Sequence, residues 1–158
     1  MGAAVGKLLR YLSFQGRTNR TRFWLTGLGV WLGALVGLAC SRVLMFAVWP
    51  PLQVLALPLF VIALIASLAN SVKRLHDRNR SAWWLLLFLG LPTVLSLPSE
   101  IAKAAAQQDA MTFGALCALL GLPFSLWGLV EMGFLKGSVG PNKYGDDPLA
   151  PPVAEVFA

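Results

Sequence analysis

Four long apolar stretches constrain this chain more than any other feature of its sequence. They predict spans over residues 23–48, 52–74, 82–98 and 112–135, where the second apolar stretch ends at Ala69 and its helix is expected to continue to about Arg74. A helix needs roughly 20 apolar residues to cross a hydrocarbon layer of about 30 Å. Because 57% of the 158 residues are hydrophobic and only 13% are charged, one water-soluble core could not bury so much apolar surface. We therefore predict an all-α polytopic membrane protein with a bundle of four transmembrane helices.

The polar ends of the chain complete the predicted organisation. We expect one membrane domain over residues 1–148 and a flexible C-terminal tail over residues 149–158, which contains two adjacent prolines. Before the first span, apolar residues recur with the spacing of one helix face. These residues are Val5, Leu8, Leu9 and Leu12. They predict a short N-terminal helix that lies in the membrane interface.

The basic residues predict an orientation. Eleven of the 13 lysines and arginines lie in the two terminal segments and in the loop between the second and third spans. Only Arg42 and Lys103 lie on the alternate side. Since cytoplasmic segments carry the excess of Lys and Arg, both termini are predicted to be cytoplasmic. Membrane orientation thus accounts for the net charge of +6, and we predict no nucleic-acid partner.

The cysteines and histidine give no sign of a metal or cofactor. Cys40 and Cys117 lie inside apolar stretches, and neither belongs to a C-x-x-C motif or a Cys/His cluster. Both are interpreted as small apolar packing residues. We predict neither a cofactor nor a metal site.

Three polar blocks on the predicted cytoplasmic side carry a family resemblance. They are FQGRTNRTRFW at 14–24, RLHDRNRSAWW at 74–84 and GPNKYGDDP at 140–148. In this order, around four hydrophobic spans, they resemble a bacterial inner-membrane family called domain of unknown function 805. Ala82 and Asp146 depart from its pattern, where Gly and Pro are usual. The resemblance implies a four-helix domain in the bacterial inner membrane and brings no established activity.

One carboxylate in the fourth span adds to these blocks. Glu131 lies near the cytoplasmic end of that span, where an ionised group is unfavourable unless it is paired. Its expected partners are Arg20, Arg74 and Arg78. A cluster of this kind either fixes the helix ends together or binds a ligand, and we favour the structural role. The candidate cluster comprises Arg17, Arg20, Arg74, His76, Asp77, Arg80, Trp83, Trp84, Glu131, Asn142, Tyr144 and Asp147.

Local spacing predicts some contacts inside this cluster. Arg17 and Arg20 would share a face if both were helical. Adjacent residues of a helix point about 100° apart, so His76 and Asp77 are not expected to form a catalytic pair. The third block is rich in turn-forming residues, and we predict a compact turn that folds back under the helices. In that turn, Asp147 would pair with an arginine of the first or second block, and Tyr144 would pack near Trp24 or Trp83.

These features favour a non-enzymatic inner-membrane module. Its cytoplasmic face, rich in Arg and Trp, would bind an anionic lipid headgroup or dock on a larger membrane complex as an accessory subunit. A protein partner or a homo-oligomer remains open. One alternative is a small transporter or channel component. The other is a membrane enzyme that acts on lipid through His76, Asp77 and Glu131.

Overall fold

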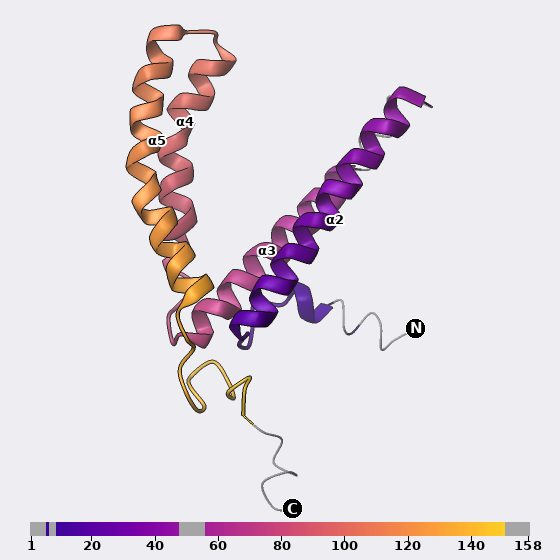
Figure 1. Ribbon diagram of the computed structural model, residues 1–158, viewed down its shortest axis with the longest axis vertical. Coiled ribbons are helices and arrows are strands. Elements are labelled where there is room, and N and C mark those ends of the chain that lie inside the picture. Colours follow the sequence, from indigo (N-terminus) through magenta and orange to yellow (C-terminus); the bar gives the residue numbers. More distant parts are fainter. Residues whose placement is uncertain (1–5, 7–8, 48–55, 151–158) are drawn as a thin grey trace, which may run out of the picture. The chain divides into compact units, whose positions relative to one another are not determined.

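The structure is a computed structural model that describes residues 6, 9–47 and 56–150 (Figure 1). It divides into two compact units, one formed by Met1–Asn79 with Gly137–Ala158 and the other by Arg80–Lys136. The described residues are mainly helical and contain no named strand. The single domain expected over residues 1–148 stays a prediction, and the units are described in turn.

The first unit begins with a short helical segment and then the long helix α2, Arg20–Ala47. Residues 9–12 are helical, and Leu9 is exposed. Val5 and Leu8, the other half of the predicted apolar face, lie outside the described residues. Asn19 caps α2, because its side-chain oxygen accepts a hydrogen bond of 2.8 Å from the backbone N–H of Arg22. The first span therefore starts three residues before its predicted position.

Helix α3, Ala56–Asp77, packs along α2 (Figure 1). Small and medium apolar residues at intervals of three form its buried face, and these are Ala66, Ala69, Val72 and Leu75. Large apolar side chains of the same helices, such as Trp31 and Phe60, are exposed. This arrangement, with small residues between the helices and large ones outside, is typical of helices packed within a membrane.

The second unit is a helical hairpin. Its first arm is the π-helical segment η2, Leu86–Gly90, followed by α4, Leu91–Ala104. Its second arm is α5, Gln108–Leu129, followed by the π-helical segment η3, Val130–Phe134. Glycines seven residues apart allow a close approach: a Cβ at Gly114 would lie 2.5 Å from the Ser99 backbone, and one at Gly121 would lie 2.9 Å from Pro92 Cα. Such contacts hold membrane helices together through backbone proximity.

Two prolines of the first arm are accommodated within the helical path. Pro92 is close to the start of α4, and the π-helical segment precedes it, which gives its ring room beside the previous turn. Pro98 lies inside α4, and the helix continues to Ala104. The prediction that the third span ends at Pro98 is therefore wrong. Neighbouring helices sustain proline-containing helices in membranes, whereas the prediction treated Pro98 as a terminator.

Within the described residues, four helices are long and apolar enough to cross a membrane, namely Arg20–Ala39, Leu57–Asp77, Leu86–Ala104 and Ala110–Phe134. This confirms the all-α polytopic fold class. The second span continues three residues past its predicted end, so Arg74, His76 and Asp77 are all helical. Parts of the predicted boundaries, residue 48 and residues 52–55, lie outside the described residues.

Candidate functional site

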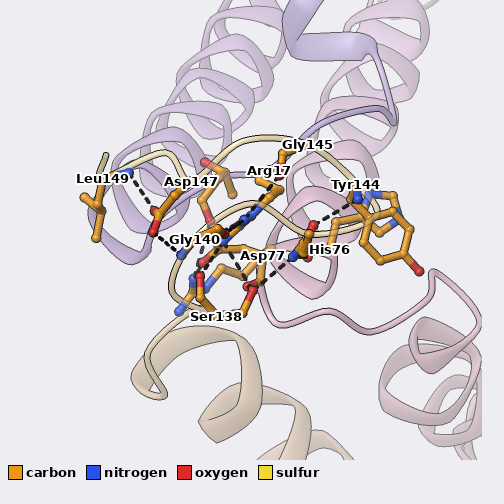
Figure 2. Close-up of polar contacts among 12 residues, drawn as sticks. Arg17, His76, Asp77, Ser138, Gly140, Tyr144, Gly145, Asp147 and Leu149 are labelled. Carbon is orange, nitrogen blue, oxygen red and sulfur yellow. Dashed lines mark hydrogen bonds and ion pairs between the residues drawn. The ribbon is translucent and has the colours of Figure 1, made fainter. Parts of the chain in front are cut away.

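A buried ion cluster, which we call the Asp77 cluster, lies at the C-terminal end of α3. It consists of Asp77, Arg17, Arg74 and Ser138 (Figure 2). Asp77 Oδ1 accepts hydrogen bonds from Arg17 Nε at 3.2 Å and Nη2 at 3.0 Å, and Oδ2 accepts one from Arg74. The Arg17 and Asp77 side chains are 1% and 4% exposed. Two guanidinium groups thus share one carboxylate out of contact with water.

Arg17 also holds the segment that follows the last helix. Its guanidinium donates to the carbonyl oxygens of Ser138 at 2.6 Å and Gly140 at 2.7 Å, and more weakly to that of Gly145 at 3.3 Å. Backbone dipoles therefore supplement the single carboxylate in balancing the second positive charge. Arg17 precedes α2, after Gly16 with a φ of +90°, so Arg17 and Arg20 do not share a helix face.

The C-terminal turn, residues 138–149, caps helix α3. The last carbonyls of a helix have no partner within it and need donors from elsewhere. Ser138 supplies its N–H at 2.7 Å and its hydroxyl at 3.0 Å to the Asp77 carbonyl. Asn142 Nδ2 donates to the His76 carbonyl at 2.9 Å. The fold-back predicted for this block is present in the first unit, and it acts through the backbone of α3.

Tyr144 and Asp147 of this turn have partners that the sequence did not predict. Tyr144 stacks on His76, with ring centroids 3.8 Å apart and planes within 5° (Figure 2). It was expected near Trp24 or Trp83. Asp147 closes the turn on itself, accepting from the backbone N–H of Gly140 and of Leu149, each at 2.9 Å. These hydrogen bonds, that of Leu149 first, lower the pKa of Asp147, and among the described residues Asp147 has no ion pair with an arginine.

His76 and Asp77 point to different partners, as helix geometry predicted. Besides its stack on Tyr144, His76 Nδ1 lies 3.3 Å from the Gly16 carbonyl. Asp77 is engaged by arginines. The part of the chain that the structure describes gathers no group of three His, Cys, Asp or Glu side chains that could hold a metal ion.

A second polar group lies within the other unit. Glu131, in η3, is buried, and its Oε1 accepts a hydrogen bond of 2.7 Å from Arg80 Nε. The Arg80 guanidinium also lies over the Trp84 ring, 4.2 Å from its centroid. The sequence suggested Arg20, Arg74 and Arg78 for Glu131 and missed Arg80, which lies in the loop that its turn composition predicted.

The twelve predicted residues are divided between the two units. Seven gather around the end of α3, and these are Arg17, Arg74, His76, Asp77, Asn142, Tyr144 and Asp147. Arg80, Trp84 and Glu131 form the group of the second unit. Arg20 is the exposed first residue of α2, and Trp83 is 77% exposed.

The first unit also contains a cavity of about 670 Å³, which we call the basic pocket. It lies where the segment before α2 meets the first turns of α2 and the last turns of α3. Its basic lining residues are Arg10, Arg17, Arg22 and Lys73, and no acidic residue lines it in the part of the chain that the structure describes. Lys73 Nζ donates to the Arg10 carbonyl, and the Thr18 N–H donates to the Lys73 carbonyl at 3.3 Å, so these contacts fix the walls.

The basic residues of this pocket differ in whether their charged groups are already bound by other groups of the protein. Arg17 belongs to the Asp77 cluster, and Lys73 binds a carbonyl. In residues 6, 9–47 and 56–150, by contrast, the guanidinium groups of Arg10 and Arg22 have no ion pair. Neither residue was among the twelve candidates predicted from sequence. Their place beside the first span was visible, but their convergence with α3 depends on the tertiary fold.

Comparison with known proteins gives the family. The profile described as "Protein of unknown function (DUF805)" matches residues 11–146. The Escherichia coli inner membrane protein YhaI is 27% identical over 142 residues, covering 89% of this chain and 90% of YhaI. The uncharacterized protein YiiR of the same organism is 31% identical over 138 residues, covering 85% of each chain. No solved structure gives a significant match. The resemblance inferred from the three polar blocks is confirmed, and the chain belongs to the DUF805 family of membrane proteins.

Proposed function

We propose that this protein is a non-enzymatic module of the bacterial inner membrane that binds the headgroup of an anionic phospholipid. The basic pocket is the observation that carries this proposal. It has the volume of a small-ligand site, converging positive side chains and no acidic lining. It also lies beside the ends of two candidate spans, and the ends of a membrane-spanning helix are where contact with lipid phosphates is expected.

In the proposed orientation, this pocket faces the cytoplasmic leaflet, which carries anionic lipid headgroups. The excess of lysine and arginine beside it supports a cytoplasmic location for both termini. The name of the relative YhaI supports the inner membrane as the location of this chain.

The geometry favours headgroup binding over the alternatives. Docking of a partner complex typically uses an extended surface of about 800 Å² on each side, whereas the basic groups here line a concavity. An enzyme acting through Asp77 would need a carboxylate that can accept a proton from substrate. Arg17 and Arg74 already occupy both oxygens of Asp77, which suits a structural role.

Lipid retention by the purified full-length protein tests the proposal. Native mass spectrometry in mild detergent would compare phosphatidylglycerol with phosphatidylcholine carrying the same acyl chains. We expect the wild type to retain phosphatidylglycerol preferentially. Each basic residue near a membrane surface contributes about 1 kcal/mol toward an anionic lipid, so the double variant Arg10→Gln/Arg22→Gln should lose this preference by roughly 30-fold.

Lys103→Gln provides the matched control. Lys103 is an exposed residue of α4 outside the pocket, and its removal also lowers the net charge. It should leave the lipid preference unchanged. Equal retention of both lipids by the wild type, or an unaltered preference in the double variant, would refute headgroup binding in the basic pocket.

A further inference from the structure

A second cavity, of about 620 Å³, adjoins the basic pocket within the same unit. We call it the apolar groove. Small residues of two helices form much of its lining, namely Gly29, Gly33 and Ala34 of α2 with Ala63 and Ala66 of α3. Among the described residues, no charged side chain lines its wall. The groove therefore suits a hydrocarbon occupant.

The glycines of the groove differ from those of the second unit. A Cβ built on Gly29 or Gly33 would meet no atom within 4 Å, whereas one on Gly114 would collide with backbone. Close packing inside the described structure thus explains Gly114 and does not explain Gly29 or Gly33. At these two positions the missing side chains leave open space along α2.

The two cavities share part of their wall. Tyr11, Leu25 and Thr26 line both. From this shared wall the apolar groove extends along the membrane-spanning parts of α2 and α3, while the basic pocket surrounds the ends of those spans. A positive cavity at headgroup depth, followed by an apolar cavity at chain depth, matches the two ends of a phospholipid.

We propose that the basic pocket and the apolar groove form one site for a single anionic phospholipid. The phosphate binds beside Arg10 and Arg22, and one acyl chain lies in the groove over Gly29 and Gly33. This inference rests on the proposed function and extends it from a headgroup to a whole lipid. Inorganic phosphate or glycerol phosphate would use the basic pocket alone.

Charge favours an anionic lipid over a second copy of the chain as the occupant of the apolar groove. Glycines four residues apart also allow two membrane helices to pack closely, so a second copy of α2 could fill the groove. Helix α2 has Arg20 and Arg22 at the end beside the pocket and no acidic residue between Arg20 and Ala47. A second copy aligned with its own basic end would bring further positive charge to the basic pocket, whereas an anionic lipid brings the opposite charge.

The test fills the groove and leaves the pocket intact. In full-length Gly33→Leu, the new side chain occupies the open space over α2. Native mass spectrometry would measure binding of dioleoyl phosphatidylglycerol, and a phosphorus NMR titration would measure binding of glycerol phosphate. We expect affinity for the long-chain lipid to fall by about tenfold or more, as when two methylene groups lose their contacts. Affinity for glycerol phosphate should stay at the wild-type value.

Two further variants keep the result decisive. Ala39→Leu enlarges an exposed residue of the same helix that lines neither cavity, and it should bind both probes as the wild type does. Gly29→Leu is a second groove-filling variant for use if Gly33→Leu fails to fold.

Three outcomes would overturn the inference. If Gly33→Leu and Gly29→Leu bind the long-chain lipid normally while Arg10→Gln/Arg22→Gln does not, the headgroup proposal stands and the acyl-chain site is wrong. If the wild type prefers no anionic lipid, both proposals fail. If the groove variants convert a dimer to a monomer, as seen in the mass of the complex, a second copy of the chain occupies the groove.

Discussion

Arg17 and Asp77 lie sixty positions apart in the sequence and meet through two hydrogen bonds, 3.0 and 3.2 Å long, to the same carboxylate oxygen. Arg74 binds the other oxygen of Asp77. One carboxylate therefore connects the segment before α2 with the end of α3. Through Arg17, the same contact reaches the C-terminal turn. Many polar side chains of the three blocks in this unit therefore hold its segments together. The basic pocket lies beside these contacts.

Asp77→Asn should destabilise the protein strongly. It removes the negative charge that Arg17 and Arg74 share, and breaking a buried ion pair costs about 3–5 kcal/mol. Glu100→Gln is the control, because Glu100 pairs with Lys103 at an exposed position where the effect is about 0–1 kcal/mol. Thermal unfolding in detergent measures both. Similar unfolding temperatures for the two variants would contradict a buried role for Asp77.

Gly114→Ala should weaken the hairpin of the second unit. The added methyl would lie 2.5 Å from the Ser99 backbone, so α4 and α5 must separate, and overpacking of this kind costs about 1–3 kcal/mol. At Gly29, the same substitution meets open space and should stabilise helix α2 by about 0.5–1 kcal/mol. Unfolding of both variants in one detergent provides the comparison. A neutral Gly114→Ala would argue against close approach of these helices.

Tyr144→Leu should increase the fraction of molecules in which the C-terminal turn is detached from α3. The turn is held partly by the stack of Tyr144 on His76, and aromatic pairs contribute about 0.5–1.5 kcal/mol. Trypsin cleavage after Lys143 tracks the open population, so the cleavage rate should rise by about 2- to 10-fold. Tyr144→Phe keeps the ring and should be cleaved at the wild-type rate. Unchanged cleavage of Tyr144→Leu would mean that the stack does not restrain the turn.

Acid should loosen the same turn through Asp147. Backbone hydrogen bonds from Leu149 and Gly140 lower the pKa of this carboxyl below its ordinary value of 3.8. A lowered folded pKa means that the ionised group stabilises the turn above the unfolded pKa, and this contribution disappears as pH falls through the folded pKa. Hydrogen exchange of residues 138–149, corrected for intrinsic rates, should therefore accelerate below about pH 4.

Asp147→Asn should remove this acid dependence, while Asp146→Asn should preserve it. Asp146 lies next to Asp147, and its carboxylate makes no hydrogen bond among the described residues. Acid dependence that persists in Asp147→Asn would assign the effect to another group.

The orientation can be tested with single cysteines in a background without Cys40 and Cys117. Because eleven of 13 basic residues lie on one predicted side, Asn79→Cys should be shielded in intact cells and Ala105→Cys should react with an impermeant maleimide. Labelling after cell lysis shows that both thiols are reactive. Preferential labelling of position 79 in intact cells would show that the true topology is the opposite of the predicted one.

The sequence predicted the helices better than the contacts between them. Length and apolar composition are properties of each segment, so the amino-acid pattern alone was enough to predict four spans. The ends of a helix are harder to predict, because local signals that start or stop a helix compete with packing against its neighbours. The N-cap Asn19 was detectable in principle. Pro98 was treated as the end of a helix, and it is tolerated inside α4. Periodicity identifies a helix face but does not select which distant residue it meets.

The candidate site shows the same division. Sequence reasoning placed Arg17, Asp77 and Asn142 in one polar group, because each belongs to a block on the same predicted side of the membrane. It could not find the stack of Tyr144 on His76, since nothing local distinguishes His76 from Trp24 as a partner. Sequence reasoning also did not identify Ser138 as a member of the cluster, because a single serine after a span has no distinctive pattern.

The contact between Arg17 and the Ser138 carbonyl has a consequence for biosynthesis. The N-terminal side of this contact leaves the ribosome first, and its C-terminal side follows only after all four spans have been made. Arg17 can form its ion pair with Asp77 early in synthesis, but the carbonyl oxygens of Ser138 and Gly140 that accept its other hydrogen bonds are made last. We expect nascent chains that stop before residue 137 to keep this end of α2 and α3 open to quality-control proteases. Completion of translation would then close it.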